Sequence, residues 1–91
     1  MSKALEKYKI CENITWRETA DEIVILNLQT SEYYSANSIG SEIWELIEKN
    51  NSKDKIINFL EQEYKINQTE AQKDTTDFLK NLLKLKLIQK I

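Results

Sequence analysis

The sequence predicts a single α+β domain over residues 1–91, with the strands first and the helices after them. Two patterns carry this prediction. In the first third of the chain apolar residues alternate with polar ones, which is the period of a strand with one buried face. From Asn37 onward they recur every three or four residues, which is the period of an amphipathic helix. The composition, 41% hydrophobic and 31% charged over 91 residues, is typical of one ordered domain with a modest core.

Three strands are expected before Asn37. The first is centred on apolar residues that share one parity, namely Tyr8, Ile10, Ile14 and Trp16. After a polar interruption at 19–21, residues 22–28 (EIVILNL) form the second, whose near-continuous apolar centre predicts a strand covered on both faces and therefore central in its sheet. A polar turn at 29–31 leads to the third, residues 32–36 (EYYSA). Short turns between successive strands predict an antiparallel meander.

Three helices are expected after the strands. Their N-caps are predicted at Asn37 or Ser38, at Ser52, and at Asn67, where Glu70 completes a capping-box arrangement. The residues expected to face the core are, helix by helix, Ile39, Ile43, Trp44, Leu46 and Ile47; Ile56, Ile57, Phe59, Leu60 and Tyr64; and Ala71, Thr75, Phe78, Leu79, Leu82 and Leu83. A short final segment with Leu87, Ile88 and Ile91 is expected to close the core.

The residue types that the chain lacks argue against an enzyme. There is no histidine and no proline, and the one glycine is Gly40. Without histidine, neither a Ser–His–Asp nor a Cys–His nucleophile can be built, and the commonest metal ligand is missing. A single glycine cannot form a phosphate-binding loop. We therefore expect no catalytic residues, no metal and no cofactor, and we expect Gly40 to allow close packing of the first helix against the sheet.

Charge and cysteine content predict a cytoplasmic protein. The net charge of −2 provides no basic field for a nucleic acid. Cys11 has no partner for an internal disulfide, which favours a reducing compartment, and it is expected to fill space within the first strand. No apolar stretch approaches the ~20 residues needed to span a bilayer. The first residues (MSKALEK) contain no apolar segment long enough for a secretory signal.

The third predicted strand is a plausible docking edge for a peptide. An edge strand exposes unpaired backbone groups, and the segment Glu32, Tyr33, Tyr34, Ser35 and Ala36 has no proline or lysine to protect it. The two tyrosines point to opposite faces, so that one can enter the core while the other lines a groove. The alternative is that both are simply half-buried strand residues.

The third predicted helix offers a second wall for such a groove. Asp74, Asp77 and Asn81 follow one another at spacings of three and four, beside Phe78 and Leu82. Together they predict an apolar pocket with an acidic rim, suited to a peptide with an apolar anchor and a basic residue. The alternative is that the two aspartates form a solvated face with the neighbouring lysines.

A longer run of residues resembles the PqqD-like family. Residues 22–47 (EIVILNLQTSEYYSANSIGSEIWELI) combine an apolar strand, a Thr-containing turn, a Tyr-Tyr strand and an Asn-x-x-Gly-x-x-Ile-Trp helix start. The residues at the corresponding positions are Tyr33, Tyr34, Asn37, Gly40, Ile43 and Trp44. Weaker matches are WRE at 16–18 and DFLKNLL at 77–83. The sequence departs from the family at Ser31 and Lys86, where glycine is frequent, at Asn27, where aspartate is frequent, and at Ala36, where leucine is usual.

This resemblance implies a winged-helix-like fold, with a three-stranded antiparallel sheet followed by three helices. It implies that the protein binds the leader segment of a ribosomally made precursor peptide as an added strand between strand 3 and helix 3. Such a protein hands the precursor to a separate modifying enzyme, such as a radical-SAM enzyme or a leader peptidase, in pathways that include lasso peptides. Because glycine is replaced by Lys86, the last helix is expected to end in a different C-cap.

Two other functions remain open from the sequence. Winged-helix folds often bind DNA, but the third predicted helix carries as many acidic as basic residues among positions 70–84, whereas a recognition helix usually has excess positive charge. A self-associating module is the other alternative, since the edge of strand 3 can pair with its own copy in a homodimer.

Overall fold

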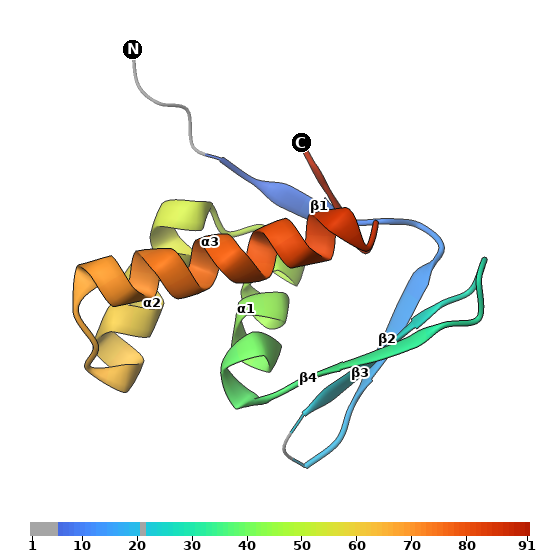
Figure 1. The fold of residues 1–91 in the computed structure, drawn as a ribbon, viewed down its shortest axis with the longest axis horizontal. Coiled ribbons are helices and arrows are strands. Elements are labelled where there is room, and N and C mark those ends of the chain that lie inside the picture. Colours follow the sequence, from blue (N-terminus) through green and yellow to red (C-terminus); the bar gives the residue numbers. More distant parts are fainter. Residues whose placement is uncertain (1–5, 21) are drawn as a thin grey trace.

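The computed structural model describes residues 6–20 and 22–91, and Figure 1 shows their arrangement. Residues 1–5, which belong to the predicted N-terminal segment, and Asp21, part of the predicted interruption after the first strand, lie outside the described part. The elements in chain order are β1 (Tyr8–Ile10), β2 (Ile14–Glu18), β3 (Ile23–Asn27), β4 (Tyr33–Ala36), α1 (Ser38–Glu48), α2 (Lys53–Tyr64), α3 (Gln68–Lys84) and β5 (Ile88–Lys90). No helix of the described residues is long and apolar enough to cross a membrane.

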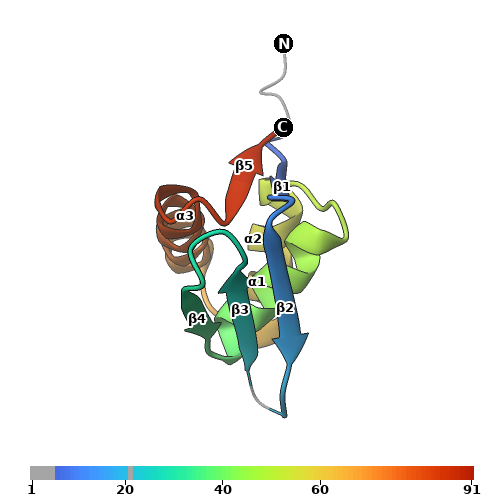
Figure 2. The same ribbon diagram turned by 90° about the vertical axis from the view of Figure 1, so that its right-hand side faces the viewer.

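The main sheet confirms the predicted fold class. It has three antiparallel strands in the order β2–β3–β4, and the three helices follow it in the chain. In the register, Trp16, Ile25 and Tyr34 form one cross-strand row that faces the core. Figure 2 shows β4 at the edge of the sheet that lies nearest to α3.

The predicted first strand is in fact two strands that belong to different sheets. After β1 the chain turns, and Ile14 N–H donates to the Cys11 carbonyl at 3.2 Å, before β2 joins the main sheet. β1 pairs instead with β5, so that the predicted final segment is a strand. Cys11 lies in the turn rather than in a strand, and its N–H donates to the Leu87 carbonyl at 3.1 Å. The apolar parity continues through this turn, which is why alternation alone could not locate it.

The strand β3 is central, as predicted, but only one of its faces is fully covered. Ile23, Ile25 and Asn27 are buried, whereas Val24 and Leu26 on the opposite face are half-buried. Leu26 is flanked in the register by Thr15 of β2 and Tyr33 of β4. The apolar outer side chains of β3 are therefore shielded by neighbours in the same sheet, and coverage on both faces was the wrong interpretation.

The predicted caps are confirmed, and the predicted core residues are buried or pack against the core, with the exception of Ile91. Ile91 follows β5 with the parity opposite to that of the buried Ile88 and is 70% exposed, so the expectation that it closes the core was wrong. The side chains of Asn37, Ser52 and Asn67 each accept a hydrogen bond from the backbone N–H three residues later, at 2.9, 3.3 and 2.8 Å. Trp44 is completely buried, and its ring meets that of the half-buried Trp16 edge to face, with centroids 5.6 Å apart. This contact packs α1 against the sheet.

The last helix ends in the C-cap typical of glycine, although glycine is absent. Lys86 has φ of 62°, and its N–H donates to the Leu83 carbonyl at 3.0 Å. The N–H of Leu87 donates to the Leu82 carbonyl at 3.0 Å, which completes a Schellman motif. The expectation of a different C-cap was therefore wrong. Ser31, the other residue at a frequent glycine position, also has positive φ, at 67°.

Candidate peptide-binding groove

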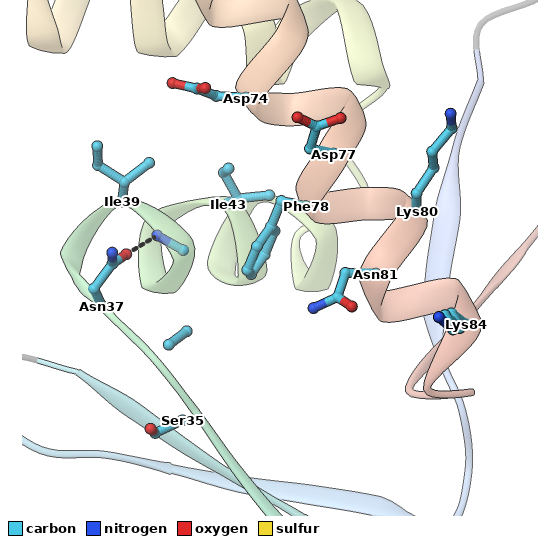
Figure 3. Close-up of a pocket in the computed structure, with 12 residues that line it drawn as sticks. Ser35, Asn37, Ile39, Ile43, Asp74, Asp77, Phe78, Lys80, Asn81 and Lys84 are labelled. Carbon is cyan, nitrogen blue, oxygen red and sulfur yellow. Dashed lines mark hydrogen bonds between the residues drawn. The ribbon is translucent and has the colours of Figure 1, made fainter.

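A groove of about 760 Å³ lies between β4, α1 and α3. Figure 3 shows the side chains that line it. The lining residues are Ser35, Ala36, Asn37, Ile39, Gly40, Ile43, Asp74, Asp77, Phe78, Lys80, Asn81 and Lys84. They provide an apolar floor from α1 and Phe78, a polar strand edge from β4, and a charged wall from α3.

The floor depends on close packing around Gly40. A Cβ atom at this position would lie 3.0 Å from the Cβ of Ala36 and 3.0 Å from Cε1 of Phe78. Such distances are tighter than nearly all Cβ contacts in proteins, so a side chain here would require a neighbour to move by a few tenths of an ångström. Gly40 was expected to bring α1 close to the sheet, and it does so at Ala36. It also brings α3 close to α1 through Phe78.

β4 presents a free edge to this groove. Within the described residues it pairs only with β3, through Ile23–Leu26, so the backbone groups on its other side have no strand partner. Ser35 is exposed at this edge. At its end, the Ala36 carbonyl already accepts a hydrogen bond from Ser41 Oγ at 3.2 Å. The edge available to an extended peptide is therefore short and stops where α1 begins.

A second depression of about 580 Å³ continues past the groove at the start of β4. Lys84 lines both depressions, and Glu32, Tyr34 and Lys86 line the second. The hydroxyl of Tyr34 donates to the Glu32 carboxylate at 2.8 Å, and this hydrogen bond raises the pKa of the tyrosine above its usual value. The phenol therefore stays protonated at neutral pH, with its one proton donated to Glu32 and its oxygen still able to accept a hydrogen bond.

The predicted site residues fall into three groups. Ser35, Ala36, Asp74, Asp77, Phe78 and Asn81 line the groove together. Glu32 and Tyr34 lie beside it, in the second depression. Tyr33 and Leu82 lie elsewhere: Tyr33 is 69% exposed on the outer face of the sheet, and Leu82 is 3% exposed in the core. Neither tyrosine lines the main groove.

Sequence reasoning missed part of the lining. Lys80 and Lys84 make one half of the α3 wall basic, whereas only an acidic rim was expected. Lys84 follows Asp77 and Asn81 at the same spacings of three and four that identified the aspartates, so the pattern was present. Ile39 and Ile43 of α1 were expected to serve the core alone, and they also line the groove.

Comparisons with known proteins identify the family of this chain. The family model "Coenzyme PQQ synthesis protein D (PqqD)" matches residues 22–88. Among solved structures, TbiB1 in complex with the TbiA(beta) leader peptide has 31% sequence identity and a TM-score of 0.85, and the match covers 88% of this chain and 93% of TbiB1. Lasso peptide synthetase B1 complexed with the leader peptide has 21% identity, a TM-score of 0.84 and coverage of 90% and 96%, which supports the fold. No curated protein gives a significant match. The chain belongs to the PqqD family.

Proposed function

We propose that this protein is a leader-peptide recognition element. It binds the leader segment of a ribosomally made precursor peptide as an added β-strand along β4, in the groove between β4 and α3. One observation carries the proposal: a chain of the PqqD family has an unpaired strand edge beside a partly apolar groove, and its structural relatives were solved as leader-peptide complexes. The proposed domain is the whole of residues 1–91.

The groove suits recognition of an extended peptide. Main-chain hydrogen bonds to β4 supply affinity that does not depend on sequence, and side-chain pockets next to the edge supply selectivity. Ile39, Ile43 and Phe78 offer apolar surface for an anchor side chain, while Asp74 and Asp77 offer carboxylates for a basic one. The proposed contact residues are those that line the groove or the adjoining depression, including Tyr34.

The protein performs no chemistry under this proposal and needs no cofactor. It holds the leader so that a separate enzyme, a modifying enzyme or a leader peptidase, can act on the rest of the precursor in the cytoplasm. The likeness to lasso peptide synthetase B1 favours a lasso-peptide pathway. Because peptide and a second copy of β4 would compete for one edge, any homodimer formed through β4 should dissociate when leader binds.

The test is a titration of the ¹⁵N-labelled protein with the leader of any short open reading frame encoded beside its gene. Amide shifts concentrated on Tyr33–Ala36 and on the groove face of α3, with an affinity of about micromolar or tighter, would support strand addition. Binding should persist when salt is raised, because main-chain pairing is insensitive to salt whereas phosphate contacts are not. Shifts confined to other surfaces, or a dimer whose mass is unchanged by leader, would contradict the proposal.

A further inference from the structure

The charges that line the groove are sorted along α3. Asp74 and Asp77 occupy one end of the wall, Lys80 and Lys84 the other, and Phe78 lies between them (Figure 3). Asp77 is 62% exposed and makes an ion pair with Lys73 at 3.2 Å, outside the groove. Exposed pairs of this kind are weak, so the carboxylate stays available to a peptide. The groove therefore offers an acidic half and a basic half on either side of an apolar centre.

The two halves match the two ends of β4. The start of β4 lies beside the C-terminal end of α3, since Glu32 and Tyr34 share a depression with Lys84 and Lys86. The end of β4, at Ala36, leads into α1, and Figure 3 shows Asp74 on the side of Ile39 and Asn37. A strand added antiparallel to β4, as every pair in this sheet is, would begin at the acidic half and finish at the basic half.

The length of the α3 wall determines how many residues should separate the two charged residues of a bound peptide. Asp74 and Lys84 are ten helical residues apart, which is roughly 15 Å at about 1.5 Å per residue. An extended strand covers that distance in about four to five residues at about 3.4 Å each. From Asp77 to Lys84 the corresponding distance is ~10 Å, or about three strand residues.

We propose that this groove selects its peptide by charge order: from N- to C-terminus, a lysine or arginine, then an apolar residue over Phe78, then an aspartate or glutamate about three to five residues after the basic one. The inference rests on the proposed function and adds the class of peptide that the groove accepts. Because all four wall charges are at least partly exposed, the expected preference is modest, about threefold to tenfold in Kd at low salt.

The experiment uses a leader that binds in the titration above, in two synthetic, fluorescein-labelled forms of equal composition. One carries Lys before and Glu after the apolar anchor of its docked segment, and the other has the two charges exchanged. The native protein should bind the first form about threefold to tenfold more tightly, and the difference should shrink at high salt. A protein with Asp74→Lys, Asp77→Lys, Lys80→Glu and Lys84→Glu has the same net charge and should prefer the second form.

A neutralised protein separates charge selection from folding. Asp74→Asn, Asp77→Asn, Lys80→Gln and Lys84→Gln should bind both peptides equally while keeping the amide shifts on Tyr33–Ala36. Equal affinity of the native protein for the two forms, with those shifts present, overturns the charge-order inference and leaves the proposed function standing. Failure of the native protein to bind either form overturns both.

Discussion

Replacing Gly40 by alanine tests the packing that forms the groove floor. Alanine is the best helix former, and in an open helix interior this change would stabilise the fold by about 1 kcal/mol. Here the new Cβ would stand 3.0 Å from the Cβ of Ala36, which is fixed to the backbone of β4, and 3.0 and 3.1 Å from two ring atoms of Phe78. Overpacking of this kind costs about 1–3 kcal/mol. The net expectation is a loss of up to about 2 kcal/mol, or roughly 4–8 °C in Tm for each kcal/mol.

The same substitution should weaken leader binding. Of the two neighbours, the Phe78 ring is the one that can rotate, and the groove is the open space beside it. We expect Gly40→Ala to push this ring into the groove and raise the leader Kd severalfold in an anisotropy titration. Adding Phe78→Leu should recover part of the lost stability, and the double-mutant cycle measures the coupling. Thr69→Ala, at an exposed position of α3, is the control for propensity alone. A Gly40→Ala protein more stable by about 1 kcal/mol, with unchanged affinity, would refute the reasoning.

Three further predictions concern the C-cap, the pH range and the groove. Lys86→Gly should raise the free energy of unfolding by about 1 kcal/mol in urea denaturation, because φ of 62° is unfavourable for lysine and free for glycine, and an unchanged or lower value would contradict the Schellman assignment. Burial, followed by the hydrogen bond to Glu6, raises the pKa of Tyr8 to about 12, so the folded state holds this proton more tightly than the unfolded chain does. The contribution of this proton to the free energy of unfolding should be complete below pH 10 and fall by up to about 1.4 kcal/mol per pH unit toward pH 12. Tyr8→Phe should remove this part of the loss of stability at high pH. Tyr34→Asp and Phe78→Ala should each raise the leader Kd by about tenfold or more, whereas Lys55→Ala, on the exposed side of α2, should not; equal losses in all three would count against the groove. Lys53 is not a suitable control, because its side chain is half-buried and lies 3.9 Å from the Glu6 carboxylate.

The order of strands and helices could be predicted because apolar residues recur at every second position in the strands and at every third or fourth position in the helices. The helices were found with their N-caps, since Asn37, Ser52 and Asn67 stand directly before apolar stripes. The pairing of β1 with β5 could not be found, because it joins two three-residue strands from opposite ends of the chain, and neither is long enough to establish a pattern. Local periodicity therefore located most elements, but it missed the turn between β1 and β2, the half-buried outer face of β3 and the pairing of β1 with β5.

The residues with a left-handed backbone conformation could not be predicted either, for a different reason. Ser31, Asn50, Lys65 and Lys86 all have positive φ, and in most sequences glycine would mark several of them. The only glycine is instead in a helix, where close packing and not conformation requires it. In this chain, glycine content predicts neither the turns nor the helix ends.

Helical geometry explains which α3 residues were assigned correctly to the groove. At about 100° per residue, Leu82 falls on the same stripe as Ala71, Thr75 and Leu79, all of which are buried. Leu82 therefore belongs to the core, although it follows Phe78 by one turn. The groove stripe lies on the adjacent side and includes Lys80 and Lys84, which sequence reasoning had not assigned to the groove.

The sorting of charge along that stripe is not explained by helix stability alone. Acidic residues near the start of a helix and basic ones near its end interact favourably with the helix dipole, but this effect is confined to the first and last turns. In α3 the acidic residue of the first turn is Glu70 and the basic residue of the last is Lys84. Asp74, Asp77 and Lys80 lie between these turns, so three of the four groove charges gain little from the dipole. Asp77 also pairs with Lys73 one turn earlier, but this contact does not account for the order of all four charges. The proposed charge selection does account for it, and the exchanged-charge peptides test this directly.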